Sequence, residues 1–181
     1  MPISRFSHPT RLLATLGLIY ATSALAEESP EHRQHGAHEH GHATLDFVQE
    51  GATVNLVFKT PAANIIGFEY RPQTDEQKQT LANAIMQLKQ GETLFKFPAD
   101  AKCVQMSVDV KSELTEEEER ETHSEFTATY VFQCAQPSDL QSLQLDLFKA
   151  FPLTEEIDGQ LVTDHTQSGF ELSPDKPSVK F

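Results

Sequence analysis

The chain has 181 residues, a formal net charge of −13 and a pI near 4.9, and 38% of its residues are hydrophobic. This length suits one domain of ordinary size, and the apolar content is sufficient for a packed core. The acidic balance argues against nucleic acid or an anionic membrane surface as the main partner, because both attract positive charge.

Residues 1–26 have the layout of a secretory signal peptide. Arg5 and Arg11 precede an apolar run over residues 12–20, and the segment ends with Ala24-Leu25-Ala26. The run is shorter than the roughly 20 apolar residues that span a membrane. We therefore expect cleavage after Ala26, no membrane insertion, and a mature protein in a bacterial periplasm. A buried N-terminal helix is the alternative interpretation.

Residues 27–42 form a histidine-rich segment. Neutral imidazole is a good ligand for zinc, copper or nickel. If the first strand begins at His38, alternation places His38, His40 and His42 on one face, with successive Cα atoms about 6.7 Å apart. The segment predicts a zinc site that other divalent transition metals can also enter, and a flexible tail with weak binding is the alternative. The candidate ligands here are His32, His35, His38, His40 and His42.

Residues 43–181 are expected to form a single α+β domain. Residues 45–48 and 54–58 alternate around Glu50-Gly51-Ala52, which predicts a hairpin, and Pro61 ends its second strand. Thr74 and Gln77 form a capping-box sequence, followed by a helical stripe at Leu81, Ile85 and Leu88, with Gly91 after it. Further strands are predicted at 93–97, 103–110, 126–133, 143–148, 159–164 and 170–172. The fold class is a mainly antiparallel sheet of about seven short strands with one amphipathic helix.

Cys103 and Cys134 are the only cysteines, so an oxidising compartment leaves a single pairing. Cys103 opens one predicted strand and Cys134 closes another. The simplest arrangement is an antiparallel hairpin with the cysteines opposite each other at its base and an acidic loop at 111–125. A redox-active pair is the alternative, although catalytic pairs usually have C-x-x-C spacing.

Two histidines lie away from the N-terminal segment. His123 adjoins the acidic loop and either forms a second cation site with Glu118, Glu119 or Glu121, or belongs to a solvated loop. His165 lies between two weak strands, where an ordinary surface or packed histidine is the simpler interpretation.

Five blocks of sequence follow one another in a specific order, at residues 38–45, 60–70, 123–126, 130–134 and 147–152. Together they resemble the ZrgA-type zinc-regulated periplasmic proteins of Gram-negative bacteria, and the similarity covers essentially the whole mature chain. The resemblance implies a secreted zinc-binding protein that supports zinc acquisition alongside a high-affinity importer. This chain differs in having a Glu-rich loop where relatives often have His and Asp, and Tyr70 where they often have His.

Two classes of function remain from the sequence. One is a zinc-binding protein that buffers the metal or delivers it to the binding protein of a periplasmic importer, with Glu39 and Glu69 as candidates to complete the ligand set. The other is a metal-independent periplasmic interaction module with an incidental His tail. An enzyme is not expected, because neither H-E-x-x-H nor G-x-S-x-G occurs.

Overall fold

The computed structural model describes residues 39–115 and 124–181. Nine strands in this part of the chain form two sheets, where the sequence predicted about seven strands. The larger sheet has the order β4-β5-β2-β1-β7-β8, and the smaller has the order β3-β6-β9. The larger sheet consists of β1 (His42–Glu50), β2 (Thr53–Pro61), β4 (Cys103–Ser112), β5 (Glu125–Cys134), β7 (Glu156–Val162) and β8 (Gln167–Leu172).

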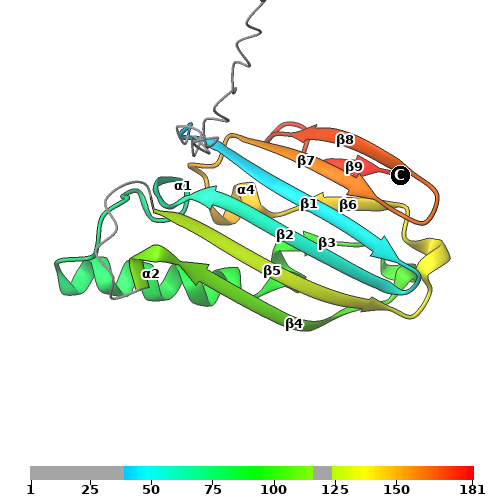
Figure 1. Cartoon of the computed structure of the whole chain (residues 1–181), viewed down its shortest axis with the longest axis horizontal. Helices are drawn as coiled ribbons and strands as arrows, with labels where there is room; N and C mark the ends of the chain where they lie inside the picture. Colours follow the sequence, from blue (N-terminus) through cyan, green and yellow to red (C-terminus); the bar gives the residue numbers. More distant parts are fainter. Residues whose placement is uncertain (1–38, 116–123) are drawn as a thin grey trace, which may run out of the picture. The chain divides into compact units, whose positions relative to one another are not determined.

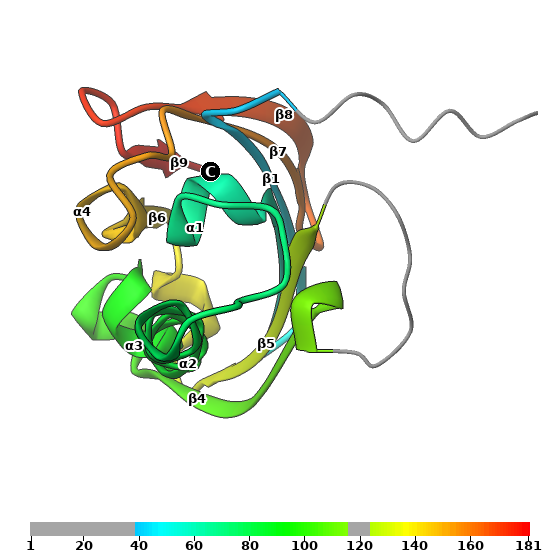
Figure 2. The ribbon, with the colours of Figure 1, turned by 90° about the vertical axis from the view of Figure 1, so that its left-hand side faces the viewer.

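The larger sheet is antiparallel except where β1 and β7 run parallel. It curves around the helices and the smaller sheet, which cover one of its faces, and Figures 1 and 2 show the other face uncovered by them. We call this second face the open face. The covering elements are α1 (Ala62–Ile66), α2 (Asp75–Leu88), α3 (Gly91–Leu94), α4 (Leu147–Ala150), β3 (Phe95–Lys96), β6 (Ser142–Leu145) and β9 (Ser178–Lys180).

Strand alternation separates the core from the open face. In β1 the odd-numbered residues from Ala43 to Phe47 are buried, whereas the even-numbered residues point to the open face. In the core, the Tyr130 hydroxyl donates to the carbonyl of Leu88 at 2.7 Å, and its ring meets Phe95 edge-on at 4.8 Å between centroids. Burial raises the pKa of Tyr130. The Tyr130 side chain therefore attaches the end of α2 to β5, next to the edge strand β4.

The long helix agrees with the sequence prediction. Thr74 Oγ1 accepts from the N–H of Gln77, and the Gln77 side chain accepts from the N–H of Thr74, so the capping box is formed. Leu81 and Leu88 are buried, and Ile85 packs against the core. Among the described helices, none is both long and apolar enough to cross a membrane.

Two predicted strands are wrong over part of their length. Gly91–Leu94 and Leu147–Ala150 are short helices, so only Phe95–Lys96 and Ser142–Leu145 remain as strands. Leu94 and Phe95 are adjacent and both buried, as are Leu147 and Phe148. A strand would send neighbouring side chains to opposite faces, whereas a helical turn, which holds Leu94, Leu147 and Phe148, lets both members of each pair reach the core.

The disulfide hairpin is confirmed. Cys103 and Cys134 are bonded and lie directly opposite each other in the antiparallel pair β4–β5. The loop predicted at 111–125 begins later than expected. β4 continues to Ser112, and a 3₁₀ turn follows at Glu113–Thr115. The rest of the acidic run lies outside the described residues.

Candidate metal centre

The start of β1 differs from the expected arrangement. The strand begins at His42, and the preceding residues form a turn in which the His42 N–H donates to the carbonyl of Glu39 at 3.1 Å. Gly41 has a φ of +90°, a conformation that glycine adopts more readily than any other residue. The shared face of His38, His40 and His42 was expected if the strand began at His38, and this condition is not met, because β1 begins at His42 after a turn at Gly41.

His42 contacts carboxylates that the sequence analysis did not select. His42, Thr44, Glu156 and Asp158 all point to the open face, and the parallel register pairs His42 with Glu156 and Thr44 with Asp158. Nδ1 of His42 lies 3.4 Å from Oε1 of Glu156. His42, Glu156 and Asp158 each offer one ligand atom, and these three atoms lie within 4.8 Å of one another. We call these three residues the His42 cluster.

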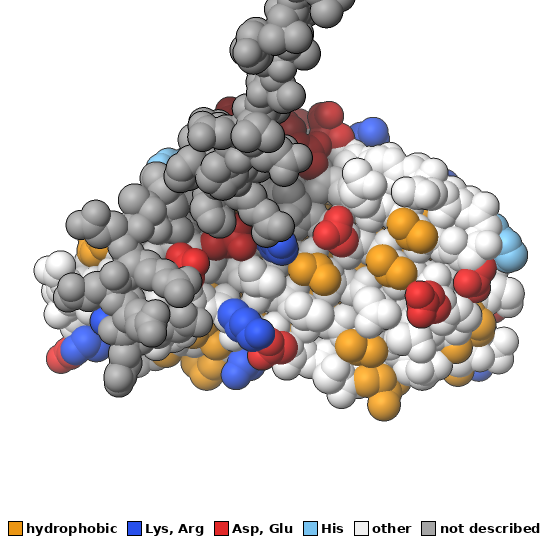
Figure 3. All heavy atoms as spheres, viewed as in Figure 1, with side chains coloured by type: hydrophobic (Ala, Val, Ile, Leu, Met, Phe, Trp, Pro, Cys, Tyr) orange, Lys and Arg blue, Asp and Glu red, His pale blue; other side chains and the backbone are white. Residues whose placement is uncertain are grey.

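The His42 cluster is half exposed to solvent. The side chains of His42 and Glu156 are 39% and 35% exposed, and Asp158 is exposed. Figure 3 shows apolar side chains on the uncovered part of the open face, with separate acidic side chains between them. Nε2 of His42 is also 3.8 Å from Oε1 of Glu39, so carboxylate oxygens lie near both ring nitrogens. The field around this imidazole is therefore negative and favours a cation.

His40 and Glu69 are brought together beside this cluster. Nε2 of His40 lies 3.4 Å from Oε1 of Glu69, a carboxylate oxygen that is buried although the His40 side chain is 68% exposed. Glu69 belongs to the loop between α1 and α2, and its carbonyl accepts from Ser124 Oγ at 3.1 Å. Both residues were selected from the sequence, and the structure adds that they form a pair separate from the three atoms of the His42 cluster.

Four of the candidate ligands and the expected signal peptide lie outside the described residues. These are His32, His35, His38 and His123, with the signal peptide at 1–26. Their roles stay predictions. Among the described residues, the His42 cluster is the group of three or more donors in which the ligand atoms converge.

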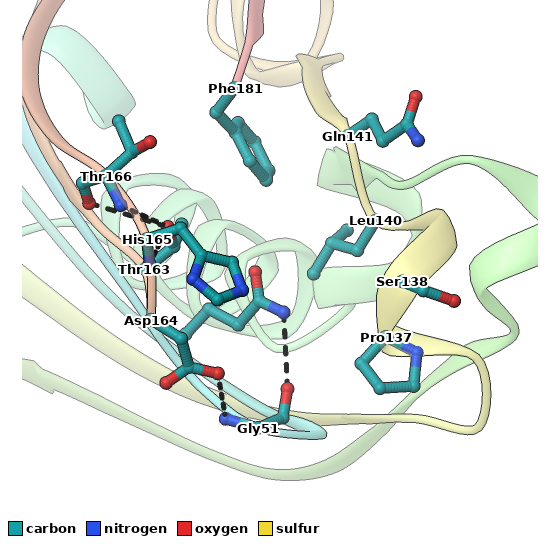
Figure 4. Close-up of a pocket in the computed structure, with 11 residues that line it drawn as sticks. Gly51, Pro137, Ser138, Leu140, Gln141, Thr163, Asp164, His165, Thr166 and Phe181 are labelled. Carbon is teal, nitrogen blue, oxygen red and sulfur yellow. Dashed lines mark hydrogen bonds between the residues drawn. The ribbon is translucent and has the colours of Figure 1, made fainter.

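His165 lies at the other end of the same strands. It lines a cleft of about 400 Å³ with Gln49 and Gly51, next to the β1–β2 turn, and Figure 4 shows Pro137, Ser138 and Leu140 on the facing wall. The neighbouring Asp164 accepts from the Gly51 N–H at 3.0 Å through Oδ2. His165 is exposed and does not belong to the His42 cluster.

Glu156 and Asp158 were missed because their strand was predicted to begin at residue 159, whereas β7 begins at Glu156. The sequence Glu156-Ile157-Asp158 alternates polar and apolar residues, and Ile157 is buried between the two outward carboxylates. This alternation is the signal that could have extended the predicted strand back to residue 156. Their proximity to His42 depends on a parallel pairing of segments more than a hundred residues apart, which local periodicity does not specify.

The fold and cluster define a small α+β protein with a surface group of nitrogen and oxygen donors suited to a divalent metal ion. The model of the ZrgA family of zinc uptake proteins matches residues 37–181, so the chain belongs to this family and the resemblance seen in the sequence is confirmed. No curated protein matches the chain.

Proposed function

We propose that the chain is a periplasmic zinc-binding protein that supports zinc acquisition, either by buffering zinc or by delivering it to a high-affinity importer. The observation that carries this proposal is the convergence of His42, Glu156 and Asp158 at the point where a histidine-rich segment enters the folded domain. Membership of a zinc uptake family supports the choice of metal. The role proposed is binding, with no catalytic step.

The donor set fits zinc in part. Zinc accepts imidazole nitrogen and carboxylate oxygen and takes four ligands in closed sites. The His42 cluster offers one nitrogen and two carboxylates, so a fourth ligand from elsewhere would close the sphere. We propose that an imidazole from His32, His35 or His38 supplies it, since these residues lie four to ten positions before His42 in the sequence. Copper competes for such a set, because affinity among the divalent metals peaks at Cu²⁺ and falls at Zn²⁺, and nickel competes because imidazole suits it as well.

We propose His40 and Glu69 as an accessory pair rather than the centre of the site. Only two donor groups meet there, against three in the His42 cluster. Zinc held by two protein ligands would exchange readily with water and with other chelators. The pair thus suits capture of an ion on its way to or from the His42 cluster.

The disulfide supports a location outside the cytoplasm. Disulfides persist in oxidising compartments such as the periplasm and are rare in the reducing cytosol. The composition of residues 1–26 is in keeping with export to that compartment.

Competitive titration with a zinc chelator tests the proposal. The double variant Glu156→Gln/Asp158→Asn keeps the shape of both side chains and removes their charges. We expect it to lower zinc affinity at least tenfold, about 1.4 kcal/mol. The matched control is Glu50→Gln, an exposed carboxylate at the far end of β1, which should change the affinity less than twofold.

Two results would overturn the proposal. One is unchanged affinity in the double variant, which would put zinc binding outside the His42 cluster. The other is weak binding of many equivalents in the unmodified protein, which is the behaviour of a flexible histidine tail. The role in acquisition is tested by complementation, in which the double variant should fail to support growth of a deletion strain under zinc limitation.

A further inference from the structure

The segment from Thr60 to Tyr70 has no role in the site described above except through Glu69. It contains Asn64, which lies in α1 and is only 2% exposed. A buried amide with unmet hydrogen bonds is costly, so the partners of such a side chain indicate what it does. Asn64 has three hydrogen bonds to other parts of the chain.

Two of these bonds hold the backbone on either side of the Gly41–His42 peptide. Oδ1 of Asn64 accepts from the N–H of Gly41 at 2.8 Å, and Nδ2 donates to the carbonyl of His42 at 2.9 Å. The second Nδ2 hydrogen is directed to Thr60 Oγ1 at 3.1 Å. Thr60 is itself 1% exposed, so it helps to fix the orientation of the amide from within the core.

The same turn is held from the other side by β7. The carbonyl of Gly41 accepts from the N–H groups of Glu155 and Glu156 at 2.7 and 3.0 Å. Gly41 therefore links α1, through Asn64, to the residue that carries a carboxylate of the His42 cluster. The hydrogen bonds of Asn64 and of Gly41 together set where His42 lies relative to Glu156.

We propose that Asn64 is a positioning residue of the metal site, and this inference rests on the function proposed above. Asn64 acts through the backbone of Gly41 and His42 and does not bind the ion, since its side chain is buried and both its polar atoms are already engaged. Groups that orient metal ligands from behind typically contribute about 10- to 100-fold in metal affinity. Thr60 assists Asn64 by holding the amide in the orientation that serves both backbone groups.

The test compares zinc affinity in Asn64→Ala, Thr60→Val and Leu143→Ala. The first variant removes all three hydrogen bonds, and the second removes only the acceptor that orients the amide. Leu143 is fully buried in β6 of the smaller sheet, so its truncation destabilises the protein without touching the site. All titrations are made well below the melting temperature of each variant, so that every protein is folded.

We expect Asn64→Ala to lower zinc affinity about tenfold and Thr60→Val two- to threefold, while Leu143→Ala stays within twofold of the unmodified protein. Cobalt(II) bound in place of zinc gives a second readout, because its visible absorption reports ligand geometry. The cobalt spectrum should change in Asn64→Ala and not in Leu143→Ala, a difference that lost stability alone would not produce.

The inference is overturned if Asn64→Ala binds zinc within twofold of the unmodified protein while Glu156→Gln/Asp158→Asn loses at least tenfold. That result would leave Asn64 with a role in folding only. If Asn64→Ala does not fold, Thr60→Val provides the test. An unchanged zinc affinity and an unchanged cobalt spectrum in Thr60→Val would then overturn the inference. If the carboxylate double variant also binds normally, the proposed function has failed instead.

Discussion

His42 and Glu156 occupy opposed positions in the parallel pair of β1 and β7, with Nδ1 of His42 3.4 Å from Oε1 of Glu156. The two residues are separated by 114 positions in the sequence, from 42 to 156. The parallel pairing thus joins the end of the histidine-rich segment to a strand that carries two carboxylates on the same face. This relationship distinguishes His42 from His40, the other histidine of this segment that the structure describes.

The first prediction concerns His42 itself. His42→Ala should lower zinc affinity at least tenfold, about 1.4 kcal/mol, because the ring is the nitrogen donor of the His42 cluster. His40→Ala should lower it less, since that ring faces Glu69 instead. Competitive titration of both variants measures the difference, with the exposed His165→Ala as control. Equal and small losses at His40 and His42 would contradict an ordered site.

Zinc affinity should fall as the pH is lowered from 7.5 to 5.5. A free imidazole has a pKa of about 6.5, and zinc binds only the unprotonated ring, so protons compete with the metal across this range. The measurement is a zinc titration at several pH values in non-chelating buffers. An affinity that stays constant over this range would mean that carboxylates alone bind the ion.

Replacing Gly41 should weaken zinc binding, and this loss can be distinguished from the effect of backbone strain on stability. Gly41→Ala places a Cβ at a φ of +90° and 3.4 Å from the Glu155 side chain, at a cost of about 1 to 3 kcal/mol. Gly51→Ala is the matched control, because its φ is +56° and its Cβ would meet nothing within 4 Å. Both variants should unfold at lower urea concentration, and only Gly41→Ala should bind zinc more weakly.

The disulfide should stabilise the fold without affecting the metal. It closes a loop with a sequence separation of 31 residues, worth about 3 to 4 kcal/mol in the chain-entropy model. The Cys134 N–H donates to the carbonyl of Ala52 in the β1–β2 turn. This turn follows the end of β1 at Glu50, which is about 26 Å from His42 at 3.3 Å per residue. Replacing both cysteines with Ser should therefore lower the melting temperature and leave zinc affinity within twofold. Loss of zinc binding in a folded double variant would argue for cysteine ligation.

Tyr130 should make the protein sensitive to alkaline pH. Burial raises its pKa in the folded state above the value of about 10 expected after unfolding, so the unfolded chain loses this proton first. The contribution of Tyr130 to stability should be constant below pH 9 and should fall as the pH rises above 10. Tyr130→Phe should cost about 1 to 3 kcal/mol at pH 7, by removing the donor to Leu88, and should reduce the alkaline decline. Urea unfolding measures both, with the exposed Tyr70→Phe as control.

Local chemistry was enough to predict several elements. The capping box at Thr74 and the apolar stripe at Leu81 and Leu88 specified the long helix, because both signals act within a few turns of chain. Gly51 marked the hairpin turn between β1 and β2 for the same reason. The two cysteines left one possible pairing, which then placed two strands side by side.

The site was predictable only in part. The sequence by itself pointed to the N-terminal histidines, because five imidazoles so close together are unusual and chemically specific, and it also selected Glu69. The tertiary structure alone decided which groups face His40 and His42, the two of these histidines that it describes. Gly41 turns the chain so that His40 meets Glu69 and His42 meets Glu156, and the parallel β1–β7 pair fixes the second of these contacts. Such contacts follow from the register of segments distant in sequence, which depends on packing of the whole core and leaves no local periodic signal.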